Sequence, residues 1–134
     1  MSHVPDRYPD AVRFAFGDGP ALADELLALV LSGAKTATCM PLRAVGPGQP
    51  KPEVGRRDVV LDGAGRPRAV VETTEVVIRR FRDVPEEFAL AEGDGTFADW
   101  RDGHVRYFGR NGGFDPDMEL VCERFRLVER LGRE

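Results

Sequence analysis

The stretch LALVLSGAKTAT at residues 27–38 decides how the rest of the chain is interpreted. Leucine and valine recur there and just upstream at helical spacing, which predicts a helix from Pro20 to about Ser32 with one apolar face. Gly33 is suited to end that helix, because glycine readily adopts a left-handed backbone conformation. The stretch therefore predicts a helix that stops at a glycine, followed at once by a turn that carries Lys35.

The other elements follow from hydrophobic periodicity and from turn residues. A loop rich in proline and glycine is expected between Ala44 and Gly55, and an Asp-x-x-Glu capping box at Asp83 is expected to open a helix that reaches about Glu92. Strands are expected near residues 36–40, 58–61, 68–81 and 118–128, and an aromatic-bearing helix near residues 96–109. This order predicts an α+β fold, with a small, mostly antiparallel β-barrel flanked by helices.

Length and composition indicate one domain. The chain has 134 residues, of which 42% are hydrophobic and 31% are charged, so there is enough apolar material for a single core. We find no internal repeat and no linker that would divide it. Residues 16–130 are therefore expected to form one domain behind a flexible N-terminal arm at residues 1–15.

Charge and hydropathy restrict the partners. The net charge is −4, which argues against binding to duplex DNA because such binding needs a basic footprint. No apolar run approaches the ~20 residues that span a bilayer, and the first residues have no apolar signal segment, so no membrane partner and a cytoplasmic location are expected. The two cysteines are too few and too far apart in sequence for a disulfide scaffold or a zinc site, and neither a metal nor a cofactor is predicted.

Lys35 and Thr38 are the first candidates for chemistry. The segment is not a phosphate-binding P-loop, because the required glycine spacing and preceding strand are missing. A lysine on a turn that leaves a helix end can reach into a cleft, and Thr38 shares that cleft if the chain turns between the two residues. The alternative is a surface lysine near a helix C-terminus, where its charge favours the helix dipole.

These residues resemble a signature of the ASCH (ASC-1 homology) domains, which are related in fold to the PUA domains that bind RNA. The signature has the form Gly-x-Lys-x-x-Thr and corresponds to residues 33–38. Further similarity runs in the same order along the chain, over roughly residues 16–128, and includes the segments Phe16-Gly17-Asp18, Val71-Glu72-Thr73-Thr74-Glu75-Val76, Phe88-Ala89-Leu90-Ala91-Glu92-Gly93 and Val121-Cys122-Glu123-Arg124-Phe125.

The resemblance implies a small PUA-like β-barrel, helices at its rim and a cleft beside the signature. Members of the family are implicated in binding RNA or nucleotides. One bacterial branch removes the acetyl group from N4-acetylcytidine, and another has been associated with ribonuclease activity. The amidohydrolase roles correspond to Lys35, Thr38 and Glu92: the lysine activates the threonine as a nucleophile, and the glutamate positions the lysine or delivers a proton to the leaving amine.

Five further residues are candidates for binding a substrate. Glu72 reads a base amino group or orients Lys35, or else it is a carboxylate paired with an arginine at the barrel mouth. The remaining candidates are two arginines near the Pro/Gly loop, which would hold phosphates, and two aromatic residues of the later helix, which would stack on a base or pack in the core: Arg43, Arg57, Trp100 and Tyr107.

From the sequence, Cys39 and His104 are expected to have structural roles. No second His or Cys lies near His104 at ligand spacing, and Cys39 has no histidine close to it in sequence. Two functions remain open: hydrolysis of a nucleoside amide such as N4-acetylcytidine, or binding or cleavage of single-stranded RNA. A domain that only binds a nucleotide or another small ligand is a third option, and the sequence leaves the oligomeric state undetermined.

Overall fold

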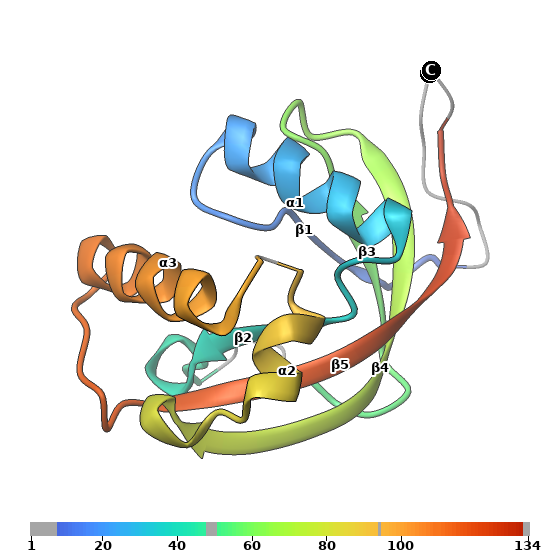
Figure 1. The fold of residues 1–134 in the computed structure, drawn as a ribbon. Coiled ribbons are helices and arrows are strands. Elements are labelled where there is room, and N and C mark those ends of the chain that lie inside the picture. Colours follow the sequence, from blue (N-terminus) through green and yellow to red (C-terminus); the bar gives the residue numbers. More distant parts are fainter. Residues whose placement is uncertain (1–7, 48–50, 94, 133–134) are drawn as a thin grey trace.

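A computed structural model describes residues 8–47, 51–93 and 95–132 (Figure 1). The part of the chain that it describes contains five strands, three α-helices and two short 3₁₀ turns, joined by loops. In chain order the elements are β1 (Val12–Phe14), α1 (Pro20–Ser32), β2 (Ala37–Pro41), η1 (Leu42–Ala44), β3 (Arg57–Leu61), β4 (Pro67–Arg80), η2 (Phe81–Asp83), α2 (Glu86–Ala91), α3 (Phe97–Arg110) and β5 (Glu119–Arg130). The predicted α+β class is confirmed.

The strands form one sheet in the order β1-β3-β4-β5-β2. Only the β1–β3 pair is parallel, so the expected mostly antiparallel sheet is confirmed. The long strands β4 and β5 pair along most of their length, with register shifts at Val70/Val71 and at Thr73/Glu75. Such irregularities bend and twist a strand, and the sheet curls into a half-barrel (Figure 1).

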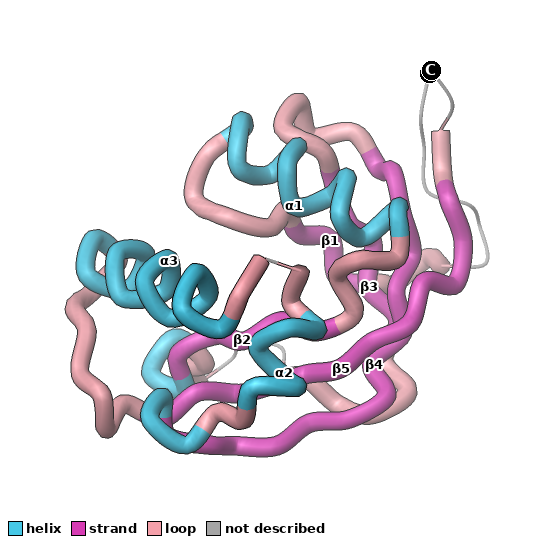
Figure 2. Tube along the Cα trace, in the orientation of Figure 1, coloured by secondary structure: helices cyan, strands magenta, loops and turns pink. Residues whose placement is uncertain are grey.

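The helices cover the curled sheet in two places. One apolar cluster lies between the sheet and helices α2 and α3 and centres on Phe81, Phe88, Trp100 and Phe108. A second lies under α1, where Leu27 and Val30 pack on residues of β3, β4 and β5. Figure 2 shows α1 and α3 as separate helices with the loop after α2 between them. None of the helices in the described ranges has the length and apolar character needed to cross a bilayer.

Most predicted elements lie where periodicity places them. Helix α1 begins at Pro20 and ends at Ser32, and Gly33 follows it with a φ of 88°, as expected. The strand expected at residues 68–81 corresponds to β4, and the one at 118–128 corresponds to β5. Local pattern was sufficient here because α1 buries one apolar face and the two long strands are rich in Val, Ile, Leu and Thr.

Two local predictions were wrong. The arm expected at residues 1–15 is in part structured: Tyr8 is buried and residues 12–14 pair with β3, while residues 1–7 lie outside the described residues. The capping box at Asp83 does not form, because this residue ends a 3₁₀ turn and Pro85 precedes helix α2 without a side-chain cap. A capping box is present instead at the start of α3, between Thr96 and Asp99.

Candidate functional site

A cleft of about 590 Å³ lies between α1 and α3 and reaches down to the start of β2. Helix α1 gives it a mostly apolar wall, and helix α3 gives it a polar wall. The residues of the first wall are Leu22, Leu26 and Leu29 together with one carboxylate, Glu25, and those of the second include Asp99, His104, Arg106, Tyr107 and Arg110. Gly103 also lies on the α3 wall, where an added Cβ would meet nothing within 4 Å. The volume is in the range of small-molecule sites, which run from roughly 300 to 1,000 Å³.

Lys35 is held at the inner end of this cleft by its backbone surroundings. Its N–H donates to Leu29 O in the last turns of α1 at 3.0 Å. The next residue, Thr36, donates to Ala91 O at the end of α2 and accepts from the N–H of Phe125 in β5. The turn is therefore tied to two helices and to the sheet, and the Lys35 side chain is only 3% exposed.

Glu92 is the partner of Lys35. The lysine Nζ lies 3.3 Å from Glu92 Oε1 and 3.4 Å from the Glu92 carbonyl oxygen. The other carboxylate oxygen, Oε2, accepts a hydrogen bond of 2.9 Å from Trp100 Nε1, and His104 Nε2 lies 3.6 Å from Oε1. Glu92 is 2% exposed, so the carboxylate is satisfied by protein donors and not by bulk water.

The Glu92 carboxyl group is ionised at neutral pH. Burial on its own would raise its pKa, but the charge of Lys35, the contact with His104 and the Trp100 N–H outweigh burial and lower the pKa to about 2. A carboxylate of this kind orients the lysine but has no proton to give. The lowered pKa and the contact with Lys35 favour positioning over proton delivery among the two roles expected for Glu92.

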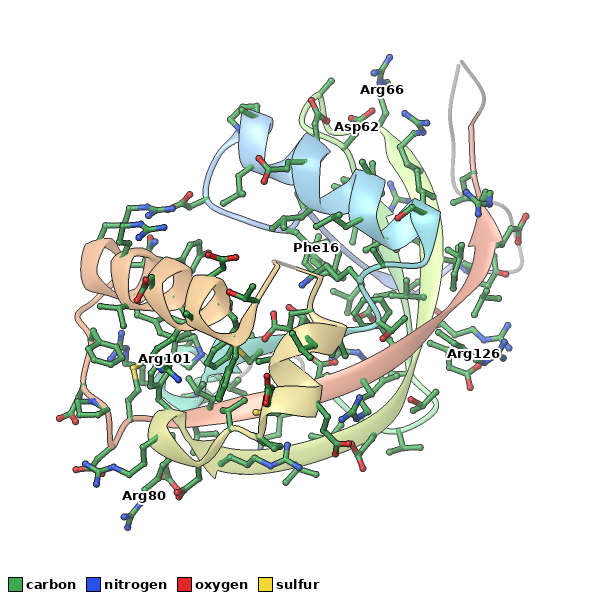
Figure 3. The ribbon with its side chains drawn as sticks, viewed as in Figure 1. Phe16, Asp62, Arg66, Arg80, Arg101 and Arg126 are labelled. Atoms are coloured by element: carbon green, nitrogen blue, oxygen red, sulfur yellow. The ribbon has the colours of Figure 1, made fainter. Side chains whose placement is uncertain are left out.

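Gly93 allows Glu92 to come this close to Lys35. Its φ is +84°, and a Cβ at this position would lie 2.9 Å from the backbone oxygen of Ala34. Only glycine accepts both the left-handed conformation and the close approach of the two chains. The aromatic ring of Phe16, labelled in Figure 3, also approaches Lys35, with its centroid 5.3 Å from the Lys35 Nζ.

Thr38 and Cys39 line the same cleft. Lys35 follows the turn at Gly33 and the bend at Ala34, and β2 begins two residues later at Ala37. Burial and the neighbouring Glu92 carboxylate raise the pKa of the Cys39 thiol well above its ordinary value. A thiol in this environment stays protonated and is a poor nucleophile, so Thr38 is the better candidate.

Three possible metal ligands meet at this point. Cys39 Sγ, a Glu92 carboxylate oxygen and a His104 ring nitrogen all lie within 4.8 Å of one another. Catalytic zinc sites use three such ligands. Here, however, the two carboxylate oxygens of Glu92 already bind the Lys35 ammonium and the Trp100 N–H, so a cation would have to compete with Lys35 for the same charge. The arrangement fits an ion pair better than it fits a metal.

The sequence analysis missed His104 as a member of this group. Helix α3 brings it beside Glu92 and Cys39, from which it is distant in the chain. The available signal was its position four residues after Trp100, which places both side chains on one helix face. In the structure the two rings stack, with centroids 4.5 Å apart.

The comparisons with known proteins agree with this geometry. The family model for the ASCH domain matches residues 12–129. The chain belongs to the ASCH domain family. The match begins at β1 and ends within β5, so it covers the whole sheet of this ASCH domain together with the cleft.

Solved structures include relatives of this ASCH domain. A protein from Enterococcus faecalis V583 shares 38% identity, with a TM-score of 0.81 over 90% of this chain and 77% of that one. An ASCH domain from Lactobacillus crispatus JV V101 shares 30% identity, with a TM-score of 0.80 over 87% and 79%. A mutant ASCH protein from Zymomonas mobilis, at 14% identity and a TM-score of 0.54 over 90% and 72%, shares the fold. No curated protein matches.

Trp100 does not have the stacking role that was considered for it. It is 1% exposed and is packed between Phe81, at 5.2 Å, and His104, so neither face is open to a base. Its contribution to the site is the N–H that binds Glu92. Tyr107 does line the cleft, with the Arg110 guanidinium 5.1 Å from its ring centroid, and burial raises the pKa of its hydroxyl.

The other predicted binding residues lie outside the cleft lining. Glu72 Oε1 pairs with Arg57 Nε at 3.0 Å and with Arg126 Nη2 at 3.2 Å, which is the arginine-paired alternative. Arg43 donates to the carbonyl oxygen of Gly113 at 2.7 Å and so ties η1 to the loop after α3. None of these residues lines the cleft that holds Lys35, and spacing in the chain does not show which sheet edge a side chain occupies.

Asp18 lies next to the cleft-lining Gly17 and binds the end of α3, a contact that the sequence did not indicate. Its carboxylate accepts two hydrogen bonds from Arg110, at 2.7 and 3.2 Å, and one from Asn111 Nδ2 at 2.8 Å. The hydrogen bonds from Arg110 and Asn111 lower the pKa of Asp18 to about 2. The loop before α1 is thereby tied to the end of α3.

Proposed function

We propose that this ASCH domain hydrolyses the amide of a small modified nucleoside, such as N4-acetylcytidine, in the cleft between α1 and α3. The observation that carries the proposal is the buried Lys35–Glu92 pair at the inner end of a cleft that Thr38 also lines. This arrangement supplies a nucleophile, an amine and a carboxylate that orients the amine. The family resemblance supplies the reaction.

The walls of the cleft support a flat, partly polar substrate. The leucines of α1 offer an apolar surface to a planar base, and the side chains of α3 offer hydrogen-bonding groups to its edge. Gly103, which has no side chain, leaves room for a ring against α3. The cleft thus combines shape and polarity in the way that small-molecule sites generally do.

Thr38 is the nucleophile of the reaction. Lys35, an ammonium beside Glu92 in the resting site, must first give a proton to solvent. Thr38 Oγ then attacks the acyl carbonyl carbon while the neutral amine of Lys35 takes the hydroxyl proton, and a bond forms between Oγ and that carbon. The carbon–nitrogen bond then breaks, the free amine leaves, and the acyl group remains on Thr38 as an ester. Water hydrolyses the ester, and Thr38 recovers its proton from Lys35. Throughout, Glu92 accepts N–H hydrogens of Lys35 through its side chain and its backbone.

The test measures, by chromatography, the release of cytidine from N4-acetylcytidine. Lys35→Arg keeps the positive charge beside Glu92 but cannot act as a base, and Thr38→Val removes the hydroxyl at nearly constant volume. Both variants are expected to lose activity by at least about 100-fold, in line with the loss of a nucleophile or base. Lys51→Arg and Thr36→Val are matched controls, since neither side chain lines the cleft, and both should retain wild-type turnover.

Single-stranded RNA serves as the second substrate in the same experiment. The arginines expected to hold phosphates, Arg43 and Arg57, lie outside the cleft, and this placement favours the amide over RNA. A different outcome would replace the amide by a phosphodiester as substrate: no cytidine is released, and RNA is cleaved in a reaction that depends on Lys35 and weakens steeply with salt. Activity that survives in both Lys35→Arg and Thr38→Val would contradict the assigned roles.

A further inference from the structure

We propose that His104 is a further catalytic residue of this site, the proton donor to the amine that leaves when the amide is cleaved. The inference rests on the proposed function. It concerns a step that the Lys35–Thr38 pair does not account for: the nitrogen of an amide leaves readily only if it receives a proton as its bond to carbon breaks.

Four other acids that line the cleft are unsuited to that step, among them Asp99, whose hydrogen bonds with Thr96 lower its pKa. Glu92 is ionised, with a pKa of about 2, and carries no proton near neutral pH. Burial raises the pKa values of the Cys39 thiol and the Tyr107 hydroxyl, so both groups hold their protons tightly. Histidine has an ordinary pKa of about 6.5, which allows it both to lose and to regain a proton under neutral conditions.

Lys35 is committed to Glu92 and Thr38. Its Nζ makes two contacts to Glu92, one to the backbone oxygen and one to Oε1. A neutral amine has two N–H bonds and one lone pair, so with both hydrogens on Glu92 its lone pair is left for the proton of Thr38. The proton that Lys35 takes is then the one that Thr38 needs back at the end of the cycle.

The ring of His104 is held in a defined orientation. Its Nδ1 lies 2.8 Å from the carbonyl oxygen of Trp100, a contact that requires Nδ1 to donate. The ring stacks on the Trp100 indole and meets the ring of Phe108 edge-on at 5.7 Å. This fixes Nε2 as the nitrogen that gains and loses the second proton.

The position of Nε2 suits a proton donor. It lies 3.6 Å from Glu92 Oε1, so the imidazolium form is paired with a buried carboxylate. The side chain is 15% exposed and lines the cleft, so a bound substrate can reach it. The titratable groups that face it from other elements are Glu92 after α2, Cys39 in β2 and, through Glu92, Lys35.

The protons balance over the whole cycle. Imidazolium Nε2–H passes its proton to the leaving nitrogen as the carbon–nitrogen bond breaks, and His104 becomes neutral. When water attacks the Thr38 ester, His104 takes a proton from that water, and Thr38 leaves with the proton held on Lys35. One water is consumed, one acid and one amine are released, and His104, Lys35 and Thr38 return to their starting forms.

The test compares two substrates that differ in whether the leaving group needs a proton. N4-acetylcytidine releases an amine and needs one, whereas p-nitrophenyl acetate releases a stable phenolate and does not. His104→Gln is expected to lower kcat for the amide by about 100- to 10,000-fold, the usual contribution of a general acid, and kcat for the ester by less than about 10-fold. Lys51→Arg, a change at a residue that does not line the cleft, should leave both rates near wild type, and Thr38→Val gives the background rate on the ester.

Each outcome decides a different question. Equal losses on both substrates would show that His104 only supports the structure, and no loss on either would assign the proton to Lys35; both results overturn the inference while the proposed function stands. A wild-type protein that releases no cytidine overturns the proposed function, and the inference with it. Should His104→Gln not fold, His104→Asn, whose amide can still donate to the carbonyl oxygen of Trp100, takes its place with the same expected split between the two substrates.

Discussion

Glu92 and Glu72 present the same chemistry in two different surroundings. Each carboxylate has two basic side chains within about 3.6 Å or less: Lys35 and His104 for Glu92, Arg57 and Arg126 for Glu72. Glu92 is 2% exposed and lies in the cleft. Glu72 is 22% exposed and lies in β4, between its partners on β3 and β5. Arg126, labelled in Figure 3, projects from the sheet well away from Phe16 and the cleft.

The difference shows that burial, more than pairing, sets how strongly a charged group depends on its partners. In water, two ions attract weakly and salt screens them, so the Glu72 pairs are exposed contacts of small effect. The hydrogen bond from Arg57 lowers the pKa of Glu72, but solvent reaches all three side chains. Glu92 is buried away from water, so loss of any one of its protein donors would leave its charge without compensation.

The largest expected effect is on stability after loss of the cation beside Glu92. Lys35→Met leaves a buried carboxylate without its counter-charge and should lower the free energy of unfolding by about 3–5 kcal/mol. Arg126→Met, the matching change beside Glu72, should have little measurable effect. Urea unfolding at pH 7 measures both. The double change Lys35→Met with Glu92→Gln should recover much of the loss, and equal effects of the two single changes would remove the distinction between the regions.

The next effect is on acid stability. The pKa of Glu92 is about 2 in the folded protein and has an ordinary value of 4.5. Because the folded value is the lower one, its stabilisation is present above pH 4.5 and is lost as the pH falls from 4.5 towards 2. The difference corresponds to roughly 3 kcal/mol.

Urea titrations between pH 7 and pH 2 check this expectation. Glu92→Gln should show a flatter dependence of unfolding free energy on pH over that window than the wild type does. Glu72→Gln should follow the wild-type curve closely. Asp18, whose pKa is also lowered to about 2, contributes in the same direction, so Asp18→Asn is the variant that separates its share. Parallel curves for the wild type and Glu92→Gln would contradict the pairing.

A smaller effect is expected from glycine substitutions in the two regions. Gly93→Ala combines a φ of +84° with a contact of 2.9 Å to Ala34 O and should cost about 1–3 kcal/mol. Gly55→Ala, just before β3, has a φ of +91° but open space around the added Cβ, so it should cost only about 1 kcal/mol. Thermal unfolding ranks the two, and the reverse order would contradict the close approach at Gly93.

The smallest effect is expected on turnover when the Glu72 region is changed. Arg57→Ala and Glu72→Gln should change kcat/KM for N4-acetylcytidine by less than about twofold, because neither residue lines the cleft. Steady-state assays with the wild type alongside are sufficient. A loss as large as that expected for Thr38→Val would place the substrate on the β3–β4–β5 surface instead.

Much of the fold could be predicted because it depends on local pattern. The apolar spacing from Pro20 to Ser32 and the glycine after it define α1 without reference to other parts of the chain. Strand β1 escaped prediction, since three residues make too short a pattern and their pairing with β3 is not local. The capping box at Asp83 failed for a related reason: Pro85 and the packing of Phe81 set the start of α2.

The candidate site divides in the same way. The resemblance to the ASCH signature pointed to Lys35 and Thr38 as candidates, and the same resemblance pointed to Glu92, because these depend on residue types in a fixed order. Only the tertiary structure showed that Glu92 loses its water, that Trp100 is a buried donor and that His104 joins the group. Desolvation and the meeting of α2, α3 and β2 are properties of the packed chain, and no local pattern in a sequence carries them.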